Sequence, residues 1–304
     1  MKLLSIAIPC YNSEAYMEKC IESLLKGGED VEILVVNDGS SDRTAEIADA
    51  YAEKYPTIIK AVHQENGGHG EAVNAGIRNA TGLYFKVVDS DDWVNEEAYA
   101  KILHTLGELV RGPETVDMLI SNFVYEKQGA ARKKVMQYRH CLPVNEIFGW
   151  DSVHMSKGKY LLMHSIIYRT SDLQRRHSEA VIQMEEKKKE IRRRELEEKY
   201  VGFQKHLIDL KEKYEFSDGE YQVIAPKSID DILYEGDTLH HCVNKTDTYF
   251  DRIVSKESYI LFLREKENPK VPFYTLEVEP DGTIRQKRAE FNRQNKDIDK
   301  VTSF

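Results

Sequence analysis

The chain has 304 residues, of which 41 % are hydrophobic and 31 % charged, and its formal net charge is −9. This composition is typical of a globular protein with room for two domains, and the acidity gives no general reason to expect nucleic-acid binding. The four cysteines lie far apart without a C-x-x-C pair, so neither a disulfide framework nor a zinc ribbon is indicated. No apolar run reaches the roughly 18 to 20 residues that span a bilayer. We expect a cytoplasmic protein, and peripheral membrane association stays open.

The first segment, residues 1–174, alternates short apolar runs with amphipathic stretches. The patterns predict strands at 3–9, 31–38, 58–64 and 83–89, and helices at 13–28, 40–55 and 69–80. This order predicts an α/β fold with a mostly parallel sheet and helices on both faces, which binds ligands at the carboxyl ends of its strands. After Trp93 we expect a helix near 96–110 and strands at 117–125, 133–138 and 160–169.

The composition changes abruptly near Leu173. Residues 175–200 hold nine Lys or Arg and seven Asp or Glu, which predicts a long solvated helix with many i,i+4 ion pairs. We interpret 175–214 as a helical connector, with a partner-binding helix as the alternative. Residues 215–304 are expected to form a small α+β module. Its predicted strands are 221–226, 259–265, 273–279 and 283–289, the last two joined by a hairpin at 280–282, and its predicted helices are 246–257 and 227–236, the latter ending at Gly236.

Polar or glycine-rich residues follow each of the first four strands, so they should meet at one edge of the sheet. Asp38 is placed to accept a hydrogen bond from a uracil imide, and Tyr11 offers a ring beside the base. Asp89, Asp91 and Asp92 repel one another unless a cation lies between them, and Mg²⁺ or Mn²⁺ shared with a diphosphate would relieve that repulsion. The alternative is that these acids only cap the helix that begins near Asn95.

Four stretches of the first segment closely resemble bacterial family 2 glycosyltransferases of the GT-A fold over about 1–174, namely SIAIPCYNSEAYMEKCIESLL, VEILVVNDGSSDRTAEIA, HQENGGHGEAVNAGIRNATGLYFKVVDSDDW and MHSIIYRT. The resemblance implies transfer of a sugar with inversion from a nucleotide-sugar donor, most often a UDP-sugar, to a glycan or lipid-linked acceptor, as in polysaccharide biosynthesis. It also implies a divalent metal, Mn²⁺ or Mg²⁺. Carried onto this chain, the nucleotide-sugar site comprises Pro9, Tyr11, Asp38, Asn66, Gly68, Asn74, Asp89 and Asp91, and the metal ligands are Asp91, Asp92 and Asp89.

Inverting transfer needs a general base to take the proton of the acceptor hydroxyl. The resemblance implies a carboxylate a couple of dozen residues after HSIIYRT, where this chain has the charged helix instead. Asp172 lies too close to that strand and Asp151 lies before it. The sequence therefore places no catalytic base, and it leaves open whether the domain transfers a sugar or only binds the donor.

Residues of about 220–304, which include GDTLHHCVNKTDTYF, resemble PcfJ-like proteins of conjugative and other mobile elements. No activity carries over from this resemblance, so the alternative function is a non-enzymatic interaction protein of a mobile element. We expect a structural role for His240, His241 and Cys242 rather than metal binding or nucleophilic catalysis. A basic edge that could touch nucleic acid is formed by Arg285, Lys287, Arg288 and Arg293, without an aromatic platform. The presence of both resemblances in one chain has two open explanations. The chain is either a natural fusion or a chimera created by assembly or gene calling.

Overall fold

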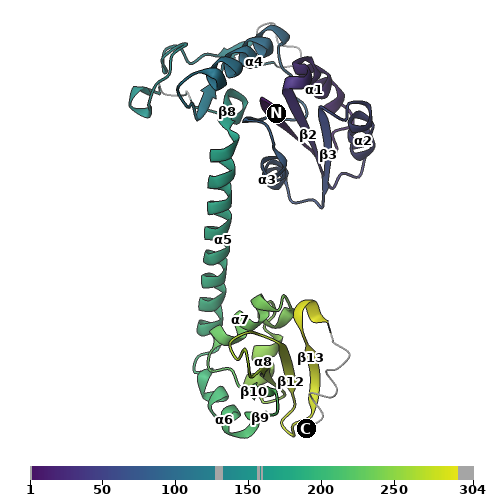
Figure 1. Cartoon of the computed structure of the whole chain (residues 1–304), viewed down its shortest axis with the longest axis vertical. Coiled ribbons are helices and arrows are strands. Elements are labelled where there is room, and N and C mark those ends of the chain that lie inside the picture. Colours follow the sequence, from purple (N-terminus) through teal and green to yellow (C-terminus); the bar gives the residue numbers. More distant parts are fainter. Residues whose placement is uncertain (1, 127–132, 156–157, 159, 294–304) are drawn as a thin grey trace. The chain divides into compact units, whose positions relative to one another are not determined.

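The structure, a computed structural model, describes residues 2–126, 133–155, 158 and 160–293. The chain divides into two compact units, Met1–Val181 and Ile182–Phe304 (Figure 1). The last residues of the predicted α+β module, 294–304, lie outside the described residues. None of the described helices is long and apolar enough to cross a membrane.

The first unit is built on a six-stranded sheet. Its strands are β1 (Leu4–Cys10), β2 (Val31–Asp38), β3 (Ile59–Gln64), β4 (Tyr84–Val87), β5 (Met118–Ile120) and β8 (Ile166–Arg169). The order is β3-β2-β1-β4-β8-β5, in which β1 to β4 are parallel and β8 is antiparallel to both β4 and β5. The predicted α/β fold with a mostly parallel sheet is confirmed.

Helices cover both faces of this sheet, as the sequence predicts. They are α1 (Met17–Leu24), α2 (Thr44–Lys54), α3 (His69–Asn79) and α4 (Glu96–Arg111). Buried residues of α1, α2 and α4 pack with Leu4, Ile6 and Ile8 of β1, whereas α3 packs with Ala7, which points to the opposite face. A Cβ at Gly76 of α3 would lie 2.5 Å from the Ala7 side chain. Glycine at that position therefore lets the helix approach the sheet closely.

Two predicted strands of the first unit differ in form from the expectation, because one divides into two strands and the other begins later. The stretch 117–125 forms β5, which pairs with β8, and then β6 (Phe123–Tyr125), which pairs with β7 (Lys134–Met136) in a separate ribbon. The stretch 160–169 is a strand only from Ile166, because Met163–Ser165 forms a 3₁₀ turn. The buried Lys86 ammonium donates to the carbonyl of His164 in that turn (2.8 Å), and the turn places His164 near the end of β4.

The long charged helix, α5 (Thr170–Lys199), begins five residues before the position expected from composition. The division between the two units falls within α5. The second unit contains α6 (Gln204–Tyr214), α7 (Ile229–Thr238) and α8 (Thr248–Ser255). Its antiparallel sheet has the order β13-β12-β11-β10-β9, with bounds β9 (Phe216–Asp218), β10 (Tyr221–Ile224), β11 (Tyr259–Glu265), β12 (Tyr274–Val278) and β13 (Ile284–Arg288). The predicted α+β character and the hairpin between β12 and β13 are confirmed.

The helix α6 lies within the predicted helical connector 175–214, but the sequence did not predict that it is separate from α5, and it did not predict β9. The prediction that Gly236 ends its helix is wrong, since α7 continues to Thr238. Gly236 lies on the buried face of α7, and a Cβ there would lie 2.6 Å from the amide carbon of Asn244. The glycine therefore serves close packing rather than helix termination.

Candidate functional site

The loops that follow β1, β2 and β4 are joined through Asn12 and Ser13. The Asn12 side-chain oxygen accepts a hydrogen bond from the backbone N–H of Ser41 (2.9 Å), and the Asn12 backbone N–H donates to the Ser40 hydroxyl (3.0 Å). The hydroxyls of Ser13 and Ser90 lie 3.0 Å apart. The loop after β1 therefore contacts the loops that leave both neighbouring strands.

Asp38, the last residue of β2, holds the loop after β3. Its Oδ1 accepts hydrogen bonds from the side-chain amide of Gln64 (2.7 Å) and the N–H of Gly67 (2.8 Å), and its Oδ2 accepts from the N–H of Gly68 (2.8 Å). Asp38 is only 2 % exposed. Hydrogen bonds to an ionised carboxylate are stronger than neutral ones, so Asp38 fixes the backbone of this loop.

His69, the first residue of α3, connects the loop after β3 to the loop after β4, because its Nε2 lies 3.1 Å from Asp89 Oδ1. Gly39 has a left-handed φ of 66°, and a Cβ there would lie 2.7 Å from the backbone nitrogen of Asn66. Only glycine allows these two loops to approach so closely. The four loops form a closed ring of contacts at the carboxyl ends of the parallel strands, where ligands bind in sheets of this kind.

Two carboxylates and one imidazole converge beside this ring. Asp89, Asp92 and His164 each offer a ligand atom, and the three atoms lie within 4.8 Å of one another. His164 Nδ1 lies 3.5 Å from Asp92 Oδ2 and 4.0 Å from Asp89 Oδ2. The Asp92 backbone N–H donates to the Asp89 carbonyl (2.9 Å), so the two acids belong to one tight turn. His164 comes from the 3₁₀ turn before β8.

Charges of both signs act on this group. Burial raises the pKa of Asp92. The negative charges of Asp89 and Asp91 raise it as well, whereas His164 lowers it. Lys86 supplies a cation nearby, but burial lowers its pKa to about 8 even though Asp92 and Asp89 favour its charged form. A further positive charge bound between the neighbouring carboxylates would lower the repulsion that remains.

The donor atoms fit a divalent cation. Carboxylate oxygens are ligands that Mg²⁺ and Mn²⁺ prefer, and an imidazole suits a transition metal better than Mg²⁺. A cation bound by Asp89, Asp92 and His164 would still have coordination positions for oxygens of a ligand, since these ions take about six ligands.

The alternative use of the acids, capping α4, is filled by another residue. Asn95 is the N-cap of α4, and its side-chain oxygen accepts a hydrogen bond from the N–H of Ala98 (3.0 Å). The acidic residues in the first turn of that helix are Glu96 and Glu97. Asp89 and Asp92 are therefore not used as helix caps.

The predicted nucleoside residues lie around the loop after β1. Pro9 is buried within β1 beside Val36 of β2. Tyr11 follows that strand with 54 % of its surface exposed, so its ring is available to a ligand. Asp38 lies on the next strand, with its carboxylate engaged by the 64–68 loop.

The other predicted residues divide between the loop ring and helix α3. Asn66 is exposed beside Gly39, and Gly68 is the residue before the first turn of α3. The Asn74 side chain donates to Glu71 Oε2 on its own helix (3.0 Å). Asp91 is exposed, and its carboxylate is not one of the three converging ligand groups.

Sequence reasoning missed three residues of this site, His69, His164 and Lys86. A lysine inside the apolar run YFKVV was a usable signal, because a buried lysine needs a nearby charge or acceptor. His164 gave no such signal, since it lies more than 70 residues from Asp92 and only the antiparallel β8 brings it back.

The resemblance places the catalytic base a couple of dozen residues after HSIIYRT, in a stretch that forms part of α5. Among the described residues that form this site, none comes from that stretch. Asp172 lies in the first turn of α5 and pairs with Arg175 (3.6 Å). Asp151 lies in a 3₁₀ turn at Trp150–Ser152.

In the second unit, the side chains of the LHHCV stretch point in different directions. His241 is buried, and its Nε2 lies 2.7 Å from the Thr275 hydroxyl. Cys242 is exposed and lies 3.5 Å from the Tyr249 hydroxyl. No group of three metal-binding side chains within the described part of the chain includes them. The predicted structural role suits His241.

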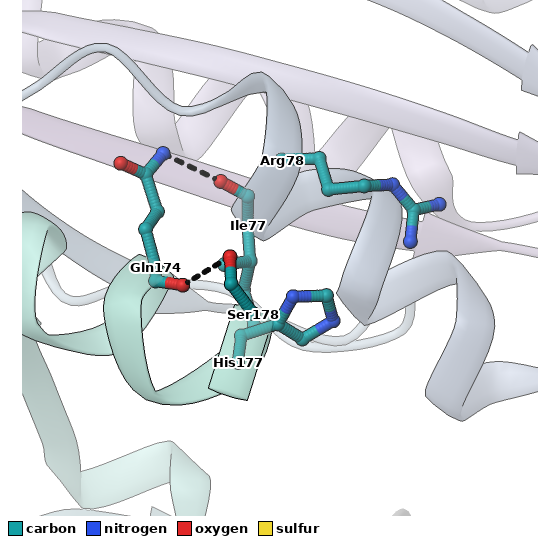
Figure 2. A pocket seen from close by; sticks show the side chains of 5 residues that line it. All are labelled: Ile77, Arg78, Gln174, His177 and Ser178. Atoms are coloured by element: carbon teal, nitrogen blue, oxygen red, sulfur yellow. Dashed lines mark hydrogen bonds between the residues drawn. The ribbon is translucent and has the colours of Figure 1, made fainter. Parts of the chain in front are cut away.

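A separate pocket of about 320 Å³ lies where α5 packs on the end of α3. It is lined by Ile77, Arg78, Gln174, His177 and Ser178, as Figure 2 shows. The Gln174 side-chain amide donates to the carbonyls of Ile77 (2.8 Å) and Ala80 (3.0 Å). None of the predicted donor or metal residues lines this pocket, so it is distinct from the loop ring.

Comparison with known families agrees with both parts of the chain. Residues 5–133 match the family described as glycosyl transferase family 2, and residues 150–302 match the PcfJ-like protein family. Both resemblances predicted from the sequence are confirmed. The second match takes in α5, which the sequence suggested as a connector, and β8, which belongs to the sheet of the first unit.

Similar proteins match the first part of the chain. The uncharacterized glycosyltransferase EpsJ of Bacillus subtilis (strain 168) is 45 % identical over 101 residues, 33 % of this chain and 29 % of EpsJ. Glycosyltransferase GlyG of Streptococcus pneumoniae serotype 4 is 38 % identical over 124 residues, 40 % of this chain and 39 % of GlyG. The chain thus spans about a third of the length of these relatives. The structure of S. aureus TarS 1–349 is similar at 28 % identity and a TM-score of 0.44, over 58 % of this chain and 49 % of that one.

Proposed function

The chain belongs to the PcfJ-like protein family and carries a family 2 glycosyl transferase domain, and on this premise we propose that its first unit binds a nucleotide sugar with a divalent cation. The donor we propose is a UDP-sugar, and the cation is Mn²⁺ or Mg²⁺. The observation that carries the proposal is the convergence of Asp89, Asp92 and His164 at the end of β4, beside the ring of loops.

The ring of loops supports the nucleoside part of this proposal. Asp38 and Gly39 hold the 64–68 loop against the end of β2, so the surface that would meet the base is fixed before binding. The exposed ring of Tyr11 lies on the next loop and offers a flat apolar face. Pro9, Asn66, Gly68 and Asn74 remain proposed members of the same site.

Asp89, Asp92 and His164 would hold the cation. When bound, the cation would neutralise the donor diphosphate and stabilise the leaving nucleoside diphosphate. Lys86 lies beneath this group and donates to the His164 carbonyl (2.8 Å), so it keeps the imidazole near the two acids. His69 also contacts this group, because its Nε2 lies 3.1 Å from Asp89 Oδ1.

Transfer of the sugar with inversion to a glycan or lipid-linked acceptor is the activity that family membership suggests. It needs a general base on the acceptor side, and neither Asp151 nor Asp172 lies among the residues that form the proposed donor site. We therefore propose that the first unit binds the nucleotide-sugar donor. If the domain is an active enzyme, it transfers the sugar of that donor to the acceptor. The rival, a non-enzymatic interaction protein of a mobile element, predicts no donor binding.

Titration calorimetry of the full chain with UDP tests the proposal, with and without Mn²⁺. We expect binding that requires the cation and weakens by about tenfold or more in Asp89→Asn and His164→Ala, because each variant removes one ligand of the proposed cation. Asp151→Asn is the matched control, since it removes one carboxylate outside the group. Absence of UDP binding by the unaltered chain in Mn²⁺ would reject the proposal, as would an equal loss in Asp151→Asn.

A further inference from the structure

The second unit carries a stacked pair of exposed rings beside its basic edge strand. The rings of His240 and Phe291 have centroids 4.8 Å apart and planes inclined by only 17°. Phe291 is 56 % exposed and His240 is also exposed. Large aromatic rings are normally buried, so this pair offers a flat apolar surface that the fold does not cover among the described residues.

Both residues are held in a costly backbone conformation. His240 has φ 50° and Phe291 has φ 54°, in the left-handed region that side chains other than glycine rarely adopt. Two backbone hydrogen bonds fix the arrangement, from the Phe291 N–H to the Leu239 carbonyl (2.8 Å) and from the Ala289 N–H to the Arg293 carbonyl (3.0 Å). Strained backbone that persists at an exposed position is a reason to look for a binding role.

One cation lies beside the ring pair, and a second lies on the same face of the sheet. The guanidinium of Arg293 lies 5.7 Å from the Phe291 ring centroid. Arg288 of the edge strand β13 is directly opposite Thr275, and directly opposed residues share one face of a sheet. Since the Thr275 hydroxyl lies 2.7 Å from His241, Arg288 lies on the same face as the stretch that carries His240.

Basic residues outnumber acidic ones on this surface, as far as the structure describes it. Residues 284–293 contain four Arg or Lys and one Glu. Arg285 is engaged by Glu257 (2.8 Å), whereas the ion pairs of the described residues leave Arg288 and Arg293 without a carboxylate. A guanidinium beside a stacked ring pair, with a second guanidinium on the same face of the sheet, matches the chemistry of an unpaired base followed by a phosphate.

We propose that the surface formed by His240, Arg288, Phe291 and Arg293 binds single-stranded nucleic acid. A base stacks on the ring pair, and the two guanidinium groups contact the adjoining phosphates. The sequence of this basic edge did not predict an aromatic platform. The platform forms only in the folded unit, where residue 240 and residue 291 meet. The inference concerns the second unit alone and does not depend on donor binding by the first.

The test is fluorescence anisotropy of the full chain with labelled oligo-dT and oligo-U of about 12 nucleotides, in EDTA so that a cation-dependent donor site contributes nothing. We expect binding that weakens steeply as salt rises from about 50 to 200 mM. Phe291→Ala should weaken binding about tenfold, because a stacked base is lost, and Phe291→Tyr should retain it because the ring is kept. Arg288→Ala should weaken binding and lower the slope of log affinity against log salt by about one.

Lys211→Ala is the matched control, because it removes an exposed positive charge on α6 without touching the ring pair, and it should bind as the unaltered chain does. Absence of binding at low salt overturns the proposal. An equal loss in Phe291→Ala and Phe291→Tyr, or in Arg288→Ala and Lys211→Ala, also overturns it. Equal competition by poly-glutamate overturns the proposal too, because the surface would then bind anions in general. Equal competition by a mononucleotide or by a duplex overturns it as well, because the surface would then be a single-nucleotide or a duplex site.

Discussion

Asp38 shows how a single residue can be predicted for one contact and found in another. The sequence suggested that its carboxylate meets a uracil imide, and the structure shows three donors of the chain itself on that carboxylate, from Gln64, Gly67 and Gly68. Contact with a base stays a prediction. The observed hydrogen bonds explain the placement of an acid at a nearly fully buried strand end, because a buried carboxylate without donors would be strongly unfavourable.

His241 is the residue from which a pH dependence follows. Burial lowers its pKa below the ordinary value of about 6.5, so the unfolded chain binds a proton more readily than the folded chain. Its contribution to stability is complete above about pH 6.5 and is lost as the pH falls toward the lowered pKa. We expect the urea midpoint of the second unit, followed by circular dichroism, to decrease when the pH is lowered from 7.5 to 5.5.

In His241→Gln this part of the pH dependence should disappear, although the variant will be less stable at both pH values because the contact with Thr275 changes. His206→Gln, in the same unit, is the matched control and should keep the pH dependence of the unaltered chain. An unchanged pH dependence in His241→Gln would contradict this role for burial of the imidazole.

At the scale of elements, the start of α5 acts as a C-terminal cap for α3. The Gln174 amide donates to the carbonyl of Ile77 (Figure 2) and to the carbonyl of Ala80. Carbonyls at the end of a helix lack full intrahelical pairing, and within the helix end Ile77 accepts only a long bond from the Ala80 N–H (3.4 Å). We expect Gln174→Glu to lower the free energy of unfolding of the first unit by about 1 to 3 kcal/mol. The carboxylate cannot donate, and it places a negative charge at the negative end of the helix dipole.

Arg176→Gln is the control for Gln174→Glu, since it changes the net charge by the same −1 at an exposed position of α5. Denaturant unfolding followed by tryptophan fluorescence measures the first unit alone, because both tryptophans, Trp93 and Trp150, belong to it. Equal effects of the two substitutions would show that charge, and not the lost hydrogen bonds, is responsible.

At the scale of the whole molecule, each unit has a hydrophobic core made of its own residues. Phe250 is fully buried in the core of the second unit. Phe250→Ala should destabilise that unit by about 3 to 5 kcal/mol, seen as an earlier loss of part of the circular dichroism signal. The tryptophan fluorescence transition should not move. A shift of both signals together would show that the units unfold as one cooperative system.

The sequence by itself determined the fold class, both family resemblances and the part of the proposed donor site that lies at the ends of strands. Strand and helix periods are local properties. Asp38 ends one strand and Asp89 and Asp92 follow another, and the ends of these strands must meet in a parallel sheet. It failed where the decisive partner is distant along the chain. Gly236 resembled a helix terminator until packing against Asn244 gave its reason.

Only the tertiary structure decided which side chains complete the two surfaces. His164 joins Asp89 and Asp92 because β8 runs antiparallel beside β4 after a long excursion of the chain. Phe291 meets His240 because β13 returns to the end of α7. Neither meeting leaves a periodic trace in the sequence, since contacts between distant segments depend on strand pairing and burial rather than on local residue preference.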